Sequence, residues 1–374
     1  MTDQFVTDVP FAPDWVSPPG DTILDLMNGR EWTQAELAER LGFSLKHVNQ
    51  LIKGKVALTE DAAIRLQSVL GSSVEFWLKR EAQYRERAAM LEAQQRHAGM
   101  IGWLDQLPVK DLMKLGVIEN RRIDANSKPR LVTEMLAFFG VATPEQWQSH
   151  YGSMEVCFRR SRAEQSDIGA ISAWLRMGEQ TAEKLDGPYY DESRFKAALQ
   201  EIRALTILSP QEFQPRLMQS LHQAGVALVL VPALPGAGVS GVARWLNAHR
   251  PLIQLSLYGK SNDRFWFTLF HEVAHILLHG KEKKAVFLDD PGNGESDSPQ
   301  EKEANAWARD FLIPRDRASM LEEMPKTKVM VKALAAELGI HSGIVVGRLQ
   351  YEGLIPMKWM NDLKDSFRFQ HLSK

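Results

Sequence analysis

Three polar side chains within an apolar stretch have the types and spacing of a metal site. His271, Glu272 and His275 form the pattern H-E-x-x-H inside residues 264–280. Residues four apart lie on one face of a helix, so both imidazoles can reach one ion, and Glu272 can reach a water molecule bound to it. Two histidine ligands and a carboxylate base are typical of zinc peptidases. We therefore predict a Zn²⁺ site with Glu272 as the catalytic base.

The alternative is an amphipathic helix that carries these residues by chance. The surrounding side chains argue against it, because they are apolar and an unliganded pair of histidines buried among them would be costly. We expect Asn262 or Asp263 to cap the start of this helix and Gly280 to end it. The side chains expected to bury the helix are Phe267, Phe270, Ala274, Leu277 and Leu278.

A catalytic zinc ion needs a third protein ligand, which residues 298–314 can supply. We predict that a helix begins there, with Ser298 as its N-cap and Glu301 in its first turn. Glu301 could bind the metal or complete a capping box with Ser298. Glu303 is an alternative ligand, but Glu301 shares a helix face with Asn305. We therefore predict Glu301 as the third ligand.

A second group of polar residues fits DNA binding. Residues 33–41 and 44–55 have the spacing of two helices that are joined by a turn at Gly42, which is the helix-turn-helix pattern. The second helix carries no carboxylate, so its lysines can hold phosphates while Asn and Gln read base edges. The alternative is a solvated helix of a small structural bundle. The predicted DNA contacts are Thr33, Gln34, Ser44, Lys46, His47, Asn49, Gln50, Lys53 and Lys55.

The length of the chain predicts several domains that position these two sites. With 374 residues it is too long for one ordinary core. We divide it into a flexible arm (1–18), a helix-turn-helix domain with a following helix (19–98), a helical linker domain (99–205) and a C-terminal domain (206–374). The expected fold class is mostly α, with a small α+β C-terminal domain. Helices predicted for the linker domain are residues 109–115, 130–139, 144–150 and 168–178.

Three short apolar runs precede the H-E-x-x-H helix and predict a small β-sheet. These runs are residues 226–231, 239–246 and 252–257. In peptidases of this kind an edge strand can bind an extended substrate through backbone hydrogen bonds. Residues 240–246 are the candidate for that strand.

The composition is that of a globular protein and restricts its partners. Hydrophobic residues make up 44% and charged residues 25%, and the net charge of −2 requires any DNA-binding surface to be local. The single cysteine, Cys157, excludes an internal disulfide and fits a reducing compartment. The start of the sequence is unlike a signal peptide, and the longest uncharged run (217–243) contains prolines. We expect a soluble, cytoplasmic protein without membrane contact.

Both patterns resemble known families. The segments LAERLGFSLKHVNQLIKGK and TEDAAIRLQSVLGSSVEFWL resemble Xre/Cro-type DNA-binding domains, particularly the HigA-like antitoxins, over about residues 19–85. The segments FTLFHEVAHILLHG and EKEANAWARDFLIP resemble the ImmA/IrrE metallopeptidases over about residues 206–355. In that family the E-x-x-x-N helix supplies the third metal ligand from the position that Glu301 occupies here.

These resemblances imply a function. The first implies a homodimer on a pseudo-palindromic double-stranded DNA operator. The second implies a zinc-dependent endopeptidase that works with, and often cleaves, an Xre-type repressor in stress or mobile-element regulation. Because both modules lie in one chain, the target could be the chain itself, another repressor, or nothing. A protein substrate or a cognate toxin or repressor is the expected protein partner.

Two other interpretations stay open. One is a non-catalytic repressor or antitoxin whose peptidase-like domain senses a ligand or partner, and the other is a peptidase that uses its helix-turn-helix only to dock on a protein. The same three ligands can also hold other divalent ions. Candidates for the oxyanion donor are His249, Tyr258, His279 and His341.

Overall fold

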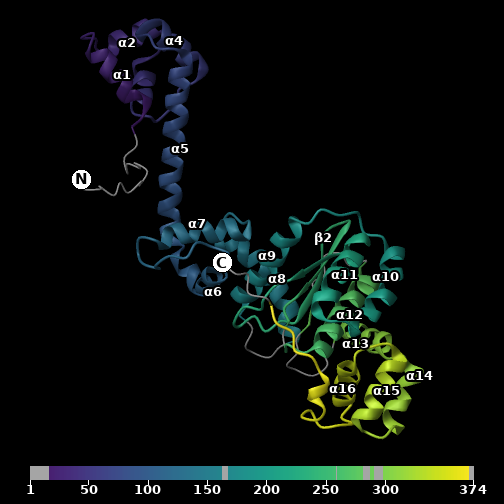
Figure 1. Cartoon of the computed structure of the whole chain (residues 1–374). Coiled ribbons are helices and arrows are strands. Elements are labelled where there is room, and N and C mark those ends of the chain that lie inside the picture. The colour runs from purple at the N-terminus through teal and green to yellow at the C-terminus, as the bar shows by residue number, and fades with distance from the viewer. Residues whose placement is uncertain (1–16, 162–166, 258, 281–286, 290–297, 370–374) are drawn as a thin grey trace, which may run out of the picture. The chain divides into compact units, whose positions relative to one another are not determined.

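A computed structural model gives the architecture of the chain (Figure 1). The residues that it describes are 17–161, 167–257, 259–280, 287–289 and 298–369, and side chains are described for these except 153–161 and 287–289. The predicted arm therefore lies almost wholly outside the described residues, as does the side chain of Cys157. Contacts between Cα atoms divide the chain into two compact units, Met1–Met100 and Ile101–Lys374.

The first unit is a helical bundle around one apolar core. Its described helices are α1 (Pro19–Asn28), α2 (Gln34–Leu41), α3 (Leu45–Ile52), α4 (Glu60–Leu70) and α5 (Val74–Gly99). Each helix contributes a fully buried side chain to the core, namely Ile23, Leu37, Val48, Leu66 and Trp77. The predicted helices are thus present, and their apolar faces meet as the spacing indicates.

The turn between α2 and α3 has the predicted geometry. Thr33 and Glu36 form a reciprocal capping box at the start of α2. Gly42 ends α2 with φ of +66°, a conformation that favours glycine. The Ser44 hydroxyl then accepts a hydrogen bond from the His47 N–H and caps α3. The helix-turn-helix expected from the sequence is therefore confirmed.

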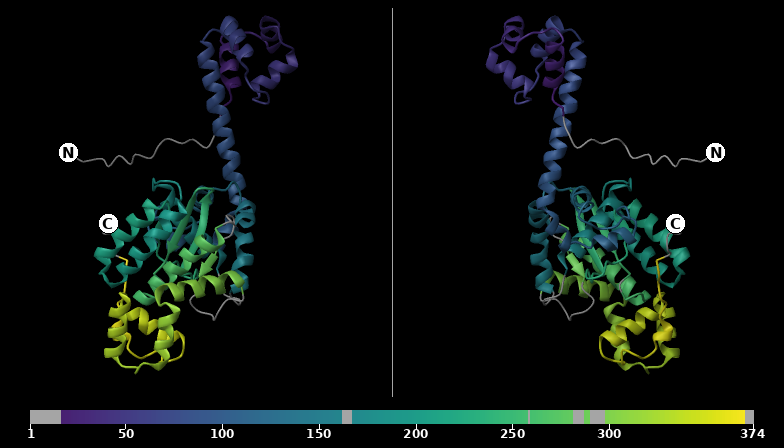
Figure 2. Two further views of the ribbon diagram at one scale, coloured as in Figure 1. Left: turned by 90° about the vertical axis from the view of Figure 1, so that its right-hand side faces the viewer. Right: turned by 90° about the vertical axis from the view of Figure 1, so that its left-hand side faces the viewer.

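The second unit contains a mixed sheet with helices packed on it (Figure 2). Its described strands are β1 (Ala227–Leu230), β2 (Gly241–Asn247), β3 (Arg250–Leu255) and β4 (Phe287–Asp289). The strand order is β1-β3-β2-β4, with β1 parallel to β3 and the other pairs antiparallel. The three predicted strands are present, which confirms a mostly helical fold with a small sheet.

The prediction that residues 240–246 form an edge strand is wrong. β4 pairs with β2 from Gly241 to Ala243, so β2 lies inside the sheet. The sequence did not reveal β4, because a three-residue strand is too short to show a periodic pattern.

Helices of the second unit carry the site and cover the sheet. The described helices are α6 (Val109–Lys114), α7 (Lys128–Phe139), α8 (Pro144–Ser161), α9 (Ile168–Glu183), α10 (Glu192–Ala204), α11 (Pro210–Gln223), α12 (Asn262–His279), α13 (Pro299–Leu312), α14 (Arg315–Glu323), α15 (Lys328–Leu338) and α16 (Ser342–Tyr351). All four helices expected in the linker region are present, and α8 and α9 extend beyond the predicted ends. Within the described residues no single helix is long and apolar enough to cross a membrane, whereas α15 and α16, bent by 114°, reach that length and composition only as a pair.

Successive side chains of the sheet face different helices. Ala243 and Ile253 lie in the core that contains α12. Arg244 and Gln254 face α9, where they donate hydrogen bonds to backbone carbonyl oxygens at 2.8 and 2.7 Å.

Arg203 of α10 donates to the carbonyl oxygens of Leu312 and Leu338 at 2.8 and 2.9 Å. Arg203 thereby supplies hydrogen-bond donors to the carbonyl groups that have no partner within the helix at the C-terminal ends of α13 and α15.

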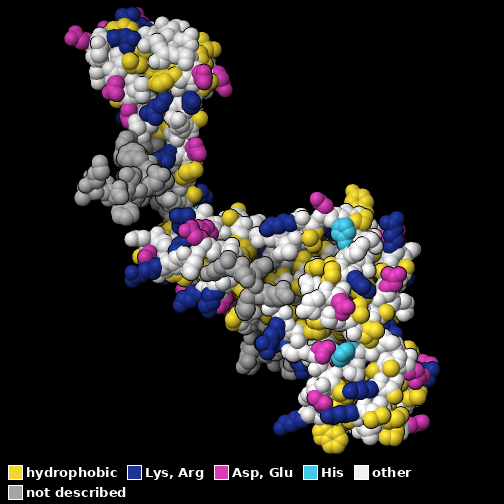
Figure 3. Space-filling view, viewed as in Figure 1, with side chains coloured by type: hydrophobic (Ala, Val, Ile, Leu, Met, Phe, Trp, Pro, Cys, Tyr) yellow, Lys and Arg dark blue, Asp and Glu magenta, His cyan; other side chains and the backbone are white. Residues whose placement is uncertain are grey.

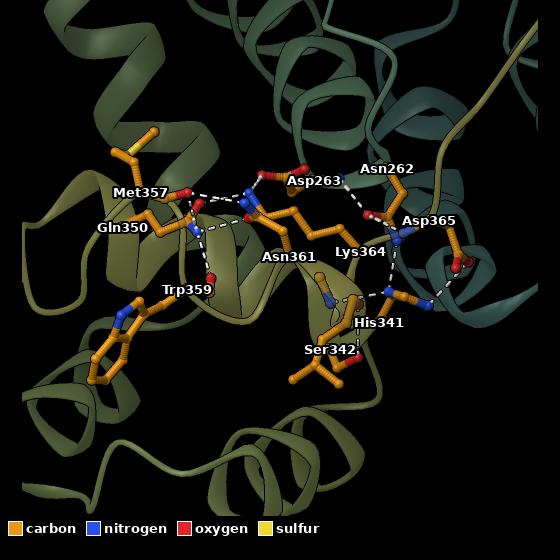
Figure 4. A network of polar contacts seen from close by, with 12 residues as sticks. Asn262, Asp263, His341, Ser342, Gln350, Met357, Trp359, Asn361, Lys364 and Asp365 are labelled. Carbon is orange, nitrogen blue, oxygen red and sulfur yellow. Dashed lines mark hydrogen bonds and ion pairs between the residues drawn. The ribbon is translucent and has the colours of Figure 1, made fainter.

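The start of α12 is held by the C-terminal segment (Figure 4). Ser261, rather than the predicted Asn262 or Asp263, is the N-cap residue. Asn262 and Asp263 lie in the first helical turn, and their side chains contact residues outside the helix. Asn262 contacts His341 Nδ1 through its amide nitrogen at 2.6 Å, and Lys364 forms a 2.6 Å ion pair with Asp263. These contacts fix the start of the helix that carries the H-E-x-x-H residues.

Candidate functional site

Helices α12 and α13 bring three metal-binding side chains together. His271 and His275 are 0% and 1% exposed, and their Nε2 atoms lie 2.9 Å apart. Glu301 of α13 places one carboxylate oxygen 3.1 Å from His271 Nε2 and the other 3.3 Å from His275 Nε2. Donor atoms at these separations fit a single ion bound at about 2.0–2.2 Å by each. The three side chains therefore form a possible metal site.

The donor set fits zinc in type as well as in spacing. Two imidazoles and one carboxylate are a common ligand set of catalytic zinc, which keeps one further position for water. Burial is the main cause that lowers the pKa of His275 to about 4. Burial alone would raise the pKa of Glu301, but the adjacent His271 and His275 rings lower it to about 2. At neutral pH, His275 is therefore neutral and Glu301 is ionised, as metal binding requires.

Further contacts orient both histidine rings. His271 Nδ1 donates to Asn305 Oδ1 at 3.0 Å, and Asn305 lies one turn after Glu301 on α13. His275 Nδ1 lies 3.1 Å from His279 Nδ1, and His279 Nε2 lies 3.1 Å from a carboxylate oxygen of Glu303. The first contact follows from the helix face that Glu301 and Asn305 share. No sequence pattern had indicated the second.

Glu272 is completely buried and faces strand β2. A Cβ atom built on Gly241 would lie 2.6 Å from Glu272 Oε1 and 2.6 Å from Thr268 Cγ2. Any larger residue at this position would therefore displace the carboxylate that we predict as the base. Gly241 is a functional position that the sequence analysis missed, because the contact depends on how β2 lies over α12.

Most of α12 is buried, as expected, but one of the side chains predicted to bury it is exposed. Phe270 and Ala274 are fully buried, whereas Leu278 is 38% exposed, so its predicted burial is wrong. Leu278 falls in the last turn of the helix. Of the oxyanion candidates, His341 caps α16 and pairs with Asp365. Tyr258 lies outside the described residues.

The predicted DNA contacts lie on the α2–α3 surface of the first unit. Exposed members of the set are Thr33, Ser44, Lys46, Lys53 and Lys55, and partly buried members are Gln34, His47, Asn49 and Gln50. Thr33 and Ser44 use their hydroxyls as helix caps. The Asn49 amide donates to Gln34 Oε1 at 3.2 Å and links the two helices. Lys46, Lys53 and Lys55 are thus exposed cations of this surface.

The fold and the site together define the class of protein. A buried His-His-Glu cluster on an H-E-x-x-H helix beside a small sheet defines a metallopeptidase-like domain, and the α2–α3 pair defines a DNA-binding domain. The IrrE N-terminal-like domain family matches residues 229–350, and the helix-turn-helix family matches residues 23–77. The chain therefore carries an Xre-type helix-turn-helix domain and an IrrE N-terminal-like domain. A comparison with curated proteins gave no match.

Proposed function

We propose that the chain is a DNA-binding transcriptional regulator of the repressor or antitoxin type that carries a zinc-dependent endopeptidase. Its target is a regulatory protein or the chain itself, in a stress or mobile-element response in the cytoplasm. The observation that carries the proposal is the convergence of His271, His275 and Glu301 beside the buried carboxylate of Glu272. A helix-turn-helix in the same chain supports a transcriptional regulator as the substrate class.

His271, His275 and Glu301 would hold the metal in this account. A bound zinc ion would polarise the scissile carbonyl and lower the pKa of a water molecule. Glu272 follows His271 directly on α12, and the backbone of β2 at Gly241 packs against its carboxylate. A carboxylate held there accepts the proton of the attacking water and delivers it to the leaving amine.

Replacement of Glu272 by glutamine tests the peptidase. The variant keeps the shape of the side chain and all three predicted ligands, so it should bind zinc as the wild type does. Its cleavage rate should fall roughly 100- to 10,000-fold, because glutamine cannot accept the proton. New peptide N-termini from a proteome-derived peptide library, quantified by mass spectrometry, provide the measurement. Equal cleavage by zinc-loaded wild type and variant would remove Glu272 from the mechanism.

The same experiment separates the two kinds of regulator. If the wild type binds one zinc ion per chain and cleaves neither the library nor a Glu272→Gln copy of itself, the domain is a non-catalytic sensor.

Selection of double-stranded DNA from a random pool, at a stated salt concentration, tests the helix-turn-helix domain. A homodimer on DNA predicts a selected site with two-fold symmetry. Failure to enrich any sequence would instead favour docking on a protein.

A further inference from the structure

Two carboxylates of helix α13 contact different histidines of α12. Glu301 reaches the two predicted ligands, whereas Glu303, two residues later, reaches His279. The His279 side chain is only 8% exposed, but that of Glu303 is 61% exposed. The pair therefore connects the interior of the site with its surface.

The contacts along this connection define an order of hydrogen-bond donors and acceptors. An ionised carboxylate only accepts hydrogen bonds, so His279 donates to Glu303 through Nε2–H. In the tautomer that carries its proton on Nε2, His279 accepts through Nδ1, and His275 donates to it through Nδ1–H. His275 is thereby left with its Nε2 lone pair directed toward His271 and Glu301. This is the tautomer that binds a metal ion.

We propose that His279 and Glu303 form a two-residue relay that positions His275 for metal binding. The inference deepens the proposed zinc site and rests on it. Groups that accept the second N–H of a ligating histidine hold the ring, fix its tautomer and make it a stronger donor. His271 has an amide, Asn305, in this role. His275 instead has a charged group that acts through a second imidazole, and Glu303 is a positioning residue.

Zinc affinity of the full chain tests the relay directly. We would measure the dissociation constant by competition with a chromophoric chelator for wild type, Glu303→Gln, His279→Phe and the double variant. Loss of an orienting group weakens metal binding roughly 10- to 100-fold, and we expect this for each single variant. Because Glu303 acts only through His279, Glu303→Gln should have no further effect in the His279→Phe background.

Two controls separate positioning from a general structural role. Glu323→Gln changes an exposed glutamate on α14 and should leave zinc affinity unchanged. The unfolding midpoint of metal-free Glu303→Gln should match that of the wild type, because the side chain is largely exposed. If His279→Phe does not fold, Glu303→Gln and its control are sufficient for the test.

An unchanged zinc affinity of Glu303→Gln overturns the relay, as does an equal loss in Glu323→Gln or a parallel loss of metal-free stability. A wild-type chain that binds no zinc overturns the proposed function together with the relay. Zinc binding without peptide cleavage contradicts the proposed peptidase alone, and the relay is still judged by the affinities. The two proposals can therefore fail separately.

Discussion

The metal centre and the α2–α3 surface both present polar side chains from helices, but they differ in what fixes those side chains. At the possible metal site the Nε2 atoms of two buried histidines lie 2.9 Å apart, and each has one carboxylate oxygen of Glu301 within 3.3 Å. On the α2–α3 surface the lysines are exposed, and Thr33, Ser44, Gln34 and Asn49 make contacts within the bundle. The buried group indicates its ligand by geometry, whereas the exposed surface indicates only a polyanionic partner.

Charge on the molecular surface agrees with this contrast. Lys, Arg, Asp and Glu side chains are interspersed over the face of the second unit that is in view (Figure 3). The net charge of the chain is −2, so any attraction to DNA would have to be local, and Lys46, Lys53 and Lys55 are exposed on this surface. The two sites should therefore respond to different changes: the metal centre to small changes of shape, and the DNA surface to charge and salt.

Among the changes that compare the two sites, the largest expected effect comes from adding one methyl group beside Glu272. The Cβ of Gly241→Ala would lie 2.6 Å from the carboxylate and force it to move. A displacement of about 1 Å can lower a catalytic rate roughly 100-fold. Peptide cleavage should fall by about this factor while zinc content stays at the wild-type level. Gly102→Ala is the matched control, because its Cβ would meet no atom within 4 Å. Unchanged cleavage by Gly241→Ala would mean that the packing of β2 against the Glu272 carboxylate does not control the cleavage rate.

Acid should destabilise the metal-free protein through the buried site. The unfolded chain binds a proton at His275 near the ordinary value of 6.5, but burial lowers the folded-state pKa to about 4. The unfolded state therefore holds more protons in this window, and stability is lost as the pH falls from 6.5 toward 4. We expect a decrease of the order of 2 kcal/mol in the free energy of unfolding. Glu301 adds a loss in the same direction below pH 4.5, because its folded pKa is about 2.

Urea titrations of the metal-free chain between pH 7 and 4 measure this dependence. A His275→Gln variant lacks the titrating group, so its curve should be flatter over the same window. Equal slopes for the wild type and the variant would contradict the assignment of the acid effect to His275.

The smallest expected effect belongs to the exposed surface. Each lysine in or directly after α3 that contacts a phosphate contributes about 0.9 to the slope of log affinity against log salt. The Lys46→Ala and Lys53→Ala variants should each reduce this slope by about that amount and weaken binding to all DNA sequences alike. Lys110→Ala, an exposed lysine of α6, serves as the control. A slope that is unchanged by both α3 variants would place the DNA contact elsewhere.

The sequence predicted those parts of the structure that depend on local spacing. The H-E-x-x-H helix and the turn at Gly42 follow from residues a few positions apart. Contacts between elements were not predictable in this way. The approach of Gly241 to Glu272 depends on the packing of β2 over α12, and the contact of His279 with Glu303 depends on the register between α12 and α13.

A repeated local pattern shows the limit of such inference. The segments LAERLG of α2 and LAAELG of α15 both end at a glycine with positive φ, +66° at Gly42 and +63° at Gly339. A short helix follows each of them. α3 exposes its lysines, whereas most of α16 is buried and packs against α12. The same local signal therefore precedes a helix on the surface of a small bundle in one place and a core helix in another.

Anomalous diffraction at the zinc edge, from crystals of the zinc-loaded chain, tests the central claim most directly. We predict one peak at about 2.0–2.2 Å from His271 Nε2, His275 Nε2 and a carboxylate oxygen of Glu301. A peak between His279 and Glu303, or no peak beside the two histidines of the H-E-x-x-H pattern, would contradict the account.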